Sequence, residues 1–348
     1  MNLFQILEVN DIVYNNSGNK VVADISYLAK TLNFKTIRIM WRSSAKTFFQ
    51  RLKRKAGYYS DWNNCYKQIA NNSVVLIQHP LHIENAHILR KLKHKKNIKI
   101  ISVVIDVEEL RKFYYNEQHR KEFELMLEIA DVLIVHNDVM AEFFIDKGIH
   151  KEKIIKVEAF DYLQGNNNIV EFEKSISFAG NLEIAKCGFI GELSKIKNLK
   201  INLYGSNFDT RLLNSTNIKY HGSFTPDEIP KKLNKGFGLV WDGDSVDTCS
   251  GYFGQYLKYN NPHKLSLYLS CGLPVVIWKQ AAQAKFVEKN KVGICVENLQ
   301  EAEHIINSMN ENDYEILKNS VNKIKPLLCS GYFATKAIKQ ALNLSQRI

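Results

Sequence analysis

The feature that most constrains the fold is a regular alternation of short apolar runs with longer stretches of helical spacing. These runs occupy residues 4–9, 36–41, 73–78, 98–105, 132–136 and 154–159, and then 175–178, 199–204, 218–220, 237–241, 275–278 and 293–296. In those at 36–41, 73–78, 98–105 and 132–136, at least half of the residues are β-branched. Buried strands separated by helix-length segments form parallel sheets with crossover helices. The pattern therefore predicts an α/β protein with two series of strands.

The break between the two series predicts a domain boundary. A chain of 348 residues exceeds the usual size of a single hydrophobic core. Residues 160–163 lead into an Asn- and Gly-rich stretch at 164–168, which is typical of an interdomain passage. We expect a first domain over residues 1–160, a second over 161–325, and a C-terminal helix over 326–348 that returns to the first domain.

Composition and the N-terminus predict a cytoplasmic globular protein. Hydrophobic residues make up 45 % and charged residues 24 %, which argues against a disordered or fibrous chain. The six cysteines lack CxxC or CxxH spacing, so free thiols of a reducing compartment are expected rather than disulfides or structural zinc. We predict no signal peptide, and no apolar run has the length of a membrane span.

Positive charge is concentrated in the first third of the chain. The net charge is +11, and residues 1–100 hold 17 Lys/Arg against 5 Asp/Glu, a difference of +12. Two basic clusters, 51–55 and 90–96, carry most of it, and Phe48, Phe49 and Tyr59 lie near the first. The clusters are interpreted either as solvated helix faces or as a contact with an anionic membrane. Nucleic acid is not expected as a partner, because no nucleic-acid-binding motif accompanies the charge.

A predicted helix start at residues 261–264 has the chemistry of a phosphate site. Asn261 is a preferred N-cap, Pro262 suits the first helical position, and Gly272 is expected to end the helix. The helix start would then present His263 and Lys264. Free N–H groups, the helix dipole and a lysine can hold a phosphate without a metal.

Four of the predicted strands in the second half end in small or polar residues. The carboxyl ends of strands in open parallel sheets border the ligand crevice. The candidates to line it are Gly180-Asn181, Gly205-Ser206-Asn207, Gly222-Ser223 and Asp242-Gly243-Asp244.

These motifs together carry a family resemblance. Residues 178–182, 204–205 and 220–230 and the helix start at 261 follow the order found in glycosyltransferase nucleotide-sugar domains. More closely, residues 238–245, 248–251 and 256–264 resemble the bacterial β-1,6-galactofuranosyltransferases of O-antigen assembly and the related glucosyltransferases of streptococcal adhesins. The resemblance extends over residues 175–300 and is weaker in the first half, at 106–111 and 160–163. It implies a GT-B fold, in which two Rossmann-like domains face a central cleft.

The resemblance implies a UDP-sugar donor site in the second domain. Lys264 and the adjacent helix start would hold the diphosphate, and Tyr204 or Phe224 would stack on uracil. The alternative interpretations are a capped core helix with a surface lysine, and aromatic residues that belong to the core. The residues expected at the donor are Asn181, Lys186, Tyr204, Gly205, Phe224, Asn261, Pro262, His263 and Lys264.

Asp242-Gly243-Asp244 also invites a metal-binding interpretation of the DxD type. That motif belongs to the other glycosyltransferase architecture, and a lysine with a helix dipole makes a metal redundant for neutralising a diphosphate. Asp242, Asp244 and Ser250 are therefore expected to contact sugar hydroxyls or to cap the following loop. No cofactor and no metal are predicted.

An inverting transfer needs a base that takes the proton of the acceptor hydroxyl. Asp106, at the end of the predicted strand 98–105, is the candidate, with Glu108 and Glu109 as rivals and a helix N-cap as its structural alternative. Residues Asn16, Ser17 and Gly18 form a polar loop expected either to contact the acceptor or to be an ordinary turn. His79, His136 and His221 lie near strand ends without metal-ligand spacing and are interpreted as polar groups of the cleft at most.

The sequence thus predicts a hexosyltransferase, with galactofuranose from UDP-galactofuranose as the expected group and a glycan of O-antigen or capsule, free or lipid-linked, as acceptor. A UDP-glucose-dependent enzyme that acts on a glycoprotein is one alternative. A non-catalytic sugar-nucleotide-binding partner of another transferase is the other. The sequence is compatible with both a monomer and a homo-oligomer.

Overall fold

The first half of the chain forms a six-stranded parallel sheet. A computed structural model describes residues 2–10, 17–41, 47–112, 115–166, 168–212 and 215–347. The strand order of the first sheet is β2-β1-β3-β4-β5-β6, and every pairing is parallel. The strands are β1 (Leu3–Asn10), β2 (Lys35–Trp41), β3 (Val74–His79), β4 (Lys99–Val104), β5 (Val132–Val135) and β6 (Ile154–Lys156).

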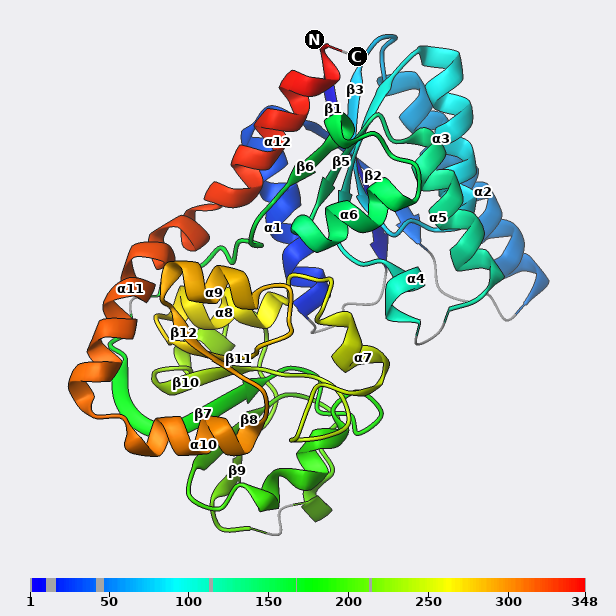
Figure 1. Cartoon of the computed structure of the whole chain (residues 1–348). Coiled ribbons are helices and arrows are strands. Elements are labelled where there is room, and N and C mark those ends of the chain that lie inside the picture. The colour runs from blue at the N-terminus through cyan, green and yellow to red at the C-terminus, as the bar shows by residue number, and fades with distance from the viewer. Residues whose placement is uncertain are drawn as a thin grey trace.

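Helices cover both faces of this sheet, as Figure 1 shows. They are α1 (Ser17–Thr31), α2 (Phe48–Gln68), α3 (Ile83–Lys96), α4 (Glu108–Arg111), α5 (Glu117–Ile129) and α6 (Asp138–Asp146), followed by the 3-10 turn η1 (Lys151–Lys153). Central strand β3 is buried over its whole length, because Leu76 packs in the core with α1 while Ile77 packs in the core with α2, α3 and α5. A continuous apolar run is the sequence signature of such a strand.

A second six-stranded parallel sheet follows, in the order β12-β11-β10-β7-β8-β9. Its strands are β7 (Glu171–Ala179), β8 (Lys200–Tyr204), β9 (Ile218–Tyr220), β10 (Lys235–Val240), β11 (Val275–Trp278) and β12 (Gly293–Val296). The connections hold the 3-10 segments η2 (Gly188–Lys195), η3 (Thr210–Leu212) and η4 (Ile229–Lys231) and the helices α7 (Gly251–Tyr256), α8 (His263–Cys271), α9 (Ala284–Asn290) and α10 (Leu299–Ser308). All twelve predicted strands are therefore present, with bounds that differ by a few residues.

The chain then crosses back to the first sheet. Helix α11 (Glu311–Ser330) packs on α8, and α12 (Tyr332–Ser345) lies against α1, β4, β5 and β6 (Figure 1). Gly331 makes the turn between them at φ +79°, where a Cβ would lie 2.3 Å from Leu28. A side chain at this position would be strained and would clash.

Asp161 joins the passage between the two sheets to helix α12, which returns to the first sheet. Its carboxylate accepts hydrogen bonds from the N–H groups of Phe333, at 3.2 Å, and Ala334, at 2.7 Å, in the first turn of α12. Burial raises the pKa of Asp161 to about 7, although these two hydrogen bonds oppose the rise. A buried carboxylate that has no cationic partner among the described residues thus joins the passage between the sheets to the returning helix.

No helix in the described part of the chain is both long enough and apolar enough to span a membrane.

Candidate active site

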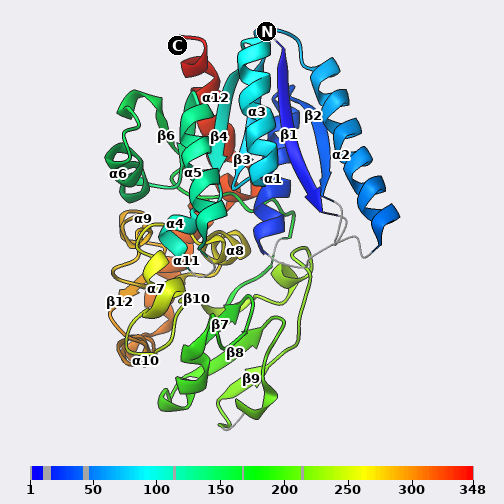
Figure 2. The same ribbon diagram turned by 90° about the vertical axis from the view of Figure 1, so that its right-hand side faces the viewer.

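A cavity of about 1010 Å³ lies between the two sheets. Its walls come from the ends of β1, β3 and β4 on one side and from the ends of β7, β8 and β10 with the start of α8 on the other. Figure 2 shows the two sheets one above the other, with α4, α7 and α8 where they meet. The cavity is therefore placed where the carboxyl ends of both parallel sheets face each other, as ligand crevices of such sheets are.

Helix α8 begins one residue later than predicted. Pro262 occupies the N-cap position and the helix starts at His263, so the prediction of Asn261 as N-cap and Pro262 as first helical residue is wrong. Gly272 ends the helix in a left-handed conformation, as predicted. No side chain caps the N-terminus of α8, and in its first turn the Leu265 N–H donates to the Pro262 carbonyl oxygen at 3.0 Å. The N–H groups of the first two residues of α8 are left without a side-chain cap at the cavity end of the helix.

Asn261 instead joins the two halves of the chain. Its Nδ2 donates to the carbonyl oxygens of His136, at 2.8 Å, and Glu158, at 3.0 Å, and its Oδ1 accepts from Asn137. Its backbone N–H donates to His136 Nδ1 at 2.8 Å. A buried amide must be satisfied in this way, and the need to pair these carbonyl groups outweighs the local capping preference.

His263 lies at the cavity wall as a neutral imidazole. Burial lowers its pKa to about 4, and its Nε2–H donates to the Asp161 carbonyl oxygen at 3.1 Å. The ring stacks on Tyr162 with centroids 5.0 Å apart. His263 therefore supplies no positive charge to a phosphate, although it stands at the predicted position.

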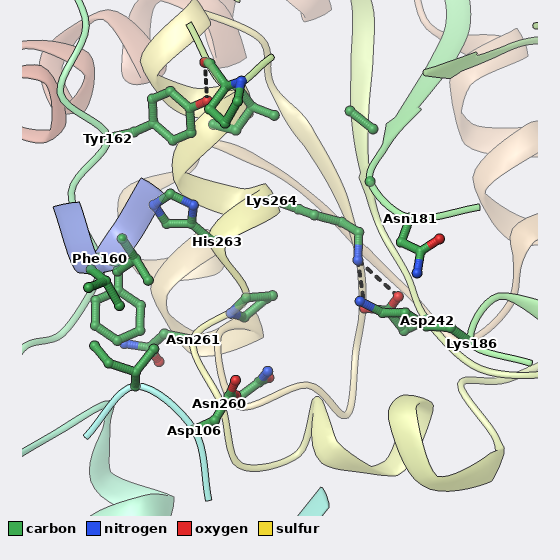
Figure 3. A pocket seen from close by; sticks show the side chains of 18 of the residues that line it. Asp106, Phe160, Tyr162, Asn181, Lys186, Asp242, Asn260, Asn261, His263 and Lys264 are labelled. Carbon is green, nitrogen blue, oxygen red and sulfur yellow. Dashed lines mark hydrogen bonds and ion pairs between the residues drawn. The ribbon is translucent and has the colours of Figure 1, made fainter. Parts of the chain in front are cut away.

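Lys264 points from α8 to Asp242, at the end of β10, as Figure 3 shows. Its Nζ donates to both carboxylate oxygens, at 2.7 and 2.9 Å. The two side chains are only 12 % and 10 % exposed, and burial opposes the charge on the ammonium, but the Asp242 carboxylate raises the pKa of Lys264. Lys264 is thus charged in the cavity and Asp242 is its counter-ion.

Asn181 and Lys186 lie on the same side of the cavity as this pair (Figure 3). Asn181 Oδ1 accepts from the Glu183 N–H, at 3.1 Å, and from Asn207 Nδ2, at 2.9 Å, so it shapes the turn after β7. The Nζ of Lys186 lies 5.4 Å from the centre of the Phe253 ring. Lys186 is thus a second cation at the same wall.

Aromatic rings gather beyond β8. Tyr204 stacks on His221 with centroids 4.6 Å apart and an interplanar angle of 9°, and Phe224 lies 6.2 Å from Tyr204. Tyr204 and Phe224 both line the cavity. At Gly205, with φ +150°, a Cβ would lie 1.7 Å from the Gly180 carbonyl oxygen, so only glycine allows this close approach of β7 and β8.

Two of the residues expected at the donor sugar lie apart from the cavity lining. Asp244 is exposed, and its carboxylate lies beside Gly251 and Gly188, where added Cβ atoms would be 2.2 and 3.3 Å from it. Ser250 precedes α7 and makes no side-chain capping bond. Of this predicted set, only Asp242 lines the cavity.

Asp106 lines the opposite side of the cavity, at the end of β4. Its Oδ2 accepts from Arg111 Nη1 at 3.2 Å, and its side chain is 33 % exposed. Arg111 also bonds Glu108, whereas Glu109 pairs with Lys147. The alternative role of Asp106 as a helix N-cap is wrong, because Val107 occupies that position of α4.

The predicted acceptor loop falls partly outside the described residues. Asn16 lies outside them, and Ser17 and Gly18 are the first residues of α1. The interpretation of 16–18 as an ordinary turn is therefore wrong for Ser17 and Gly18.

Sequence analysis missed two carboxylates beside the cavity, Glu8, which is half-buried, and Glu122, which is buried. Glu8, on β1, accepts from the His82 N–H at 3.0 Å and from Asn85, and burial raises its pKa. Glu122, on α5, accepts from His79 Nδ1 at 3.0 Å and from the Leu81 N–H at 3.1 Å. A charge inside the apolar run 4–9 was a signal for Glu8, whereas Glu122 is one of several acids on a charged helix and has no local signal.

Among the residues that the structure describes, no group of three or more His, Cys, Asp or Glu side chains could hold a metal ion.

Two family models match nearly the whole chain. Residues 4–159 match the "Glucosyltransferase 3-like, N-terminal domain" and residues 176–341 match the "Glucosyltransferase 3-like, C-terminal domain". The β-1,6-galactofuranosyltransferase WbbI of Escherichia coli is 33 % identical over 79 % of this chain and 81 % of its own length. Glucosyltransferase 3 of Streptococcus gordonii is 24 % identical over 95 % of this chain and 96 % of its own length.

Solved structures share the fold at low sequence identity. HepE of Anabaena in complex with UDP and glucose superposes with a TM-score of 0.65 at 12 % identity, over 98 % of this chain and 99 % of HepE. WaaG, a glycosyltransferase of lipopolysaccharide biosynthesis, has a TM-score of 0.57 at 12 % identity, over 96 % and 98 %. The two parallel sheets with flanking helices are the GT-B architecture, and the predicted fold class is confirmed.

Proposed function

The chain belongs to the glucosyltransferase 3-like family and is a glycosyltransferase, and from this we propose that it transfers galactofuranose from UDP-galactofuranose to a sugar hydroxyl. The acceptor is a growing bacterial surface polysaccharide or its lipid-linked precursor. The 33 % identity with WbbI supports this donor over the glucose of the more distant glucosyltransferase 3. WbbI is named a β-1,6-galactofuranosyltransferase, and solved structures of HepE hold UDP and UDP-glucose.

The observation that carries the proposal is the buried ion pair at the start of α8. Lys264 and the uncapped N-terminus of the helix put positive charge at one wall of the cavity, and Lys186 stands nearby. The oxygens of a diphosphate bound there accept hydrogen bonds from helix N–H groups and from Lys264. Asp242 keeps Lys264 charged and holds its side chain in place. The uracil ring lies toward Phe224 and Tyr204, beside the Gly205 turn.

The reaction is an in-line displacement at the anomeric carbon. The acceptor hydroxyl attacks from the first-sheet side as the bond from carbon to the diphosphate oxygen breaks. Lys264 and the α8 dipole stabilise the charge that develops on the leaving UDP. Because they already neutralise that charge, the transfer proceeds without a metal ion.

The acceptor side faces the ends of β1, β3 and β4, with Ser17 and Gly18 at the start of α1. Asp106 is the base that sequence motifs favour, and its Arg111 pair fixes one of its oxygens.

Helix α2 supports contact with an anionic membrane at the cytoplasmic face. Phe48 and Phe49 at its start are 74 % and 80 % exposed, and Lys53, Arg54 and Lys55 are exposed on the following turn. Exposed aromatic residues beside lysines and arginines suit the headgroup region. Flotation should recover the protein with vesicles that contain phosphatidylglycerol and less with Phe48→Ser/Phe49→Ser, and equal recovery on pure phosphatidylcholine would contradict this contact.

The proposed function is tested with a donor panel of UDP-galactofuranose, UDP-galactose, UDP-glucose and UDP-N-acetylglucosamine. Octyl glycosides of glucose, galactose and N-acetylglucosamine serve as acceptors, and UDP release is measured. UDP-galactofuranose is expected to give the highest kcat/KM. Preference for UDP-glucose would favour the glucosyltransferase alternative, and UDP binding without UDP release from any pair would favour a non-catalytic binding partner.

A further inference from the structure

The two imidazoles that line the cavity are held in different ways. The Nε2–H of His263 donates to a backbone carbonyl, so the ring has no anionic partner that would stabilise an imidazolium. His79, at the end of β3, is bonded through Nδ1 to the carboxylate of Glu122 at 3.0 Å. His79 Nε2 has no hydrogen-bond partner within the described part of the chain.

The contact with Glu122 decides which ring nitrogen carries the proton. A carboxylate only accepts, so Nδ1 holds the hydrogen and Nε2 presents a lone pair. Glu122 is itself held in place, because it also accepts the Leu81 N–H at 3.1 Å, and its side chain is only 6 % exposed. An oriented imidazole with a carboxylate behind it is the arrangement of a general base.

His79 also stands on the side of the cavity where a base is needed. It extends from β3, between β1 and β4, on the wall opposite Lys264 and Asp242. Glu122 on α5 contacts the ring, and the charged side chains of Glu8 on β1 and of Asp106 and Arg111 after β4 line the same cavity. Phe123 of α5 packs 6.1 Å from the ring.

Asp106 is the rival, and its surroundings are less suited to the task. Its side chain is 33 % exposed, and its Oδ2 is engaged by Arg111. An oxygen that already accepts from a guanidinium is less available to the hydroxyl of an acceptor. The backbone beside it is bound as well, because Val107 N–H donates to Tyr256 Oη at 2.9 Å. The loop after β4 that carries Asp106 is thus held against α7.

We infer that His79 is the base of the transfer and that Glu122 positions it. As the acceptor oxygen bonds to the anomeric carbon and the bond to the UDP oxygen breaks, the hydroxyl proton passes to His79 Nε2. UDP leaves with the bonding electron pair, the imidazolium is stabilised by Glu122, and the proton is later released to water. The inference rests on the proposed function, since it needs an acceptor hydroxyl in this cavity.

The test compares His79→Gln, Glu122→Gln and Asp106→Asn with wild type, using the donor and acceptor pair that releases UDP fastest. His79→Gln should lower kcat by about 100-fold or more, which is the usual contribution of a general base, with KM for the donor and the affinity for UDP unchanged. If a base acts in the transfer, wild-type kcat should decline at acid pH, and His79→Gln should lose this decline. Glu122→Gln should lower kcat by less than His79→Gln, again at unchanged donor KM.

Two further variants distinguish a loss of catalysis from a loss of folded structure. Glu124→Gln removes the same charge from the solvent-facing side of α5, where Glu124 pairs with Arg120, and should leave kcat unchanged. In His79→Ala, added imidazole should restore part of the lost rate, which a purely structural loss would not allow.

Three results would overturn the inference. His79→Gln with wild-type kcat would do so, as would an acid limb that disappears in Asp106→Asn and persists in His79→Gln. A wild-type protein that releases no UDP from any pair would overturn the proposed function, and the inference with it. An active wild type with an active His79→Gln would overturn the inference alone.

Discussion

Two aspartates, Asp242 and Asp161, are buried at the junction of the sheets, and they differ in what compensates them. Asp242 is 7 % exposed and faces the ammonium of Lys264 at 2.7 Å. Asp161 is 3 % exposed, and its carboxylate accepts from two backbone N–H groups of α12. The first is one half of an ion pair, whereas burial raises the pKa of the second to about 7. Similar burial therefore gives a permanently charged donor wall and a junction that is sensitive to pH.

The largest expected effect comes from breaking the ion pair. Lys264→Ala should lower kcat/KM for the UDP-sugar by about 100-fold or more, because the leaving diphosphate loses a charged donor. It should also lower the free energy of unfolding by about 3–5 kcal/mol, since Asp242 is left buried without a cation. Kinetics of UDP release and urea denaturation measure the two effects.

A double variant separates the two effects of that change. Lys264→Met/Asp242→Leu removes both charges, so its stability should return close to wild type while activity stays lost. Recovery of UDP release in the double variant would show that Lys264 acts only through the fold.

Asp161 provides the opposite case, in which the cost of burying a carboxylate, measured in the free energy of unfolding, depends on pH. Its folded-state pKa of about 7 lies above the ordinary 3.8, so the native state binds more protons between these values. Its contribution to stability is fully present below about pH 4 and is lost as the pH rises through 7, by on the order of 4 kcal/mol. Asp161→Asn should remove this part of the pH dependence of the unfolding free energy.

The matched control is Asp138→Asn, which changes an exposed carboxylate paired with Lys156 and should keep the wild-type slope. An unchanged slope in Asp161→Asn would mean that the junction is no more pH-sensitive than the surface.

A smaller effect is expected at the uracil end of the donor site, which uses neither aspartate. Phe224→Ala should weaken UDP binding by about 1–3 kcal/mol if the base stacks on this ring. Calorimetric titration with UDP measures the change, and Lys264→Ala provides the comparison. Equal affinity in Phe224→Ala and wild type would place the uracil elsewhere.

No change is expected when divalent metal ions are removed. Because Lys264 already neutralises the diphosphate, UDP release should persist at the wild-type rate in EDTA. Loss of activity in EDTA that Mn²⁺ restores would contradict this expectation. Asp242 would then act as a metal ligand and not as the counter-ion of Lys264.

Much of the fold was predictable because its signals are local. Apolar runs predicted every strand of both sheets, and Gly272 correctly predicted the end of α8. The structure also places Lys264 in the first turn of a helix and in the lining of the cavity. The error at Asn261 arose because a capping preference is worth only about 1 kcal/mol and yields to the hydrogen-bonding needs of a buried amide.

The partnerships within the site could not be predicted. Lys264 and Asp242 are separated by 22 positions in the chain, and His79 and Glu122 by 43. Asp161 and Ala334 are separated by 173 positions. Each pair meets only because strands and helices from different parts of the chain pack together, and no periodicity in the sequence records which charges will face each other.

By itself the sequence determined the two series of strands, the helix start that carries Lys264, and the family. Those features depend on neighbouring residues, whose hydrophobicity and backbone preferences act at short range. Only the tertiary structure decided that Asp242 is the counter-ion of Lys264, that Asp161 holds α12, and that His79 is backed by a carboxylate. Charge compensation in a buried site depends on distances across the fold, and packing alone sets those distances.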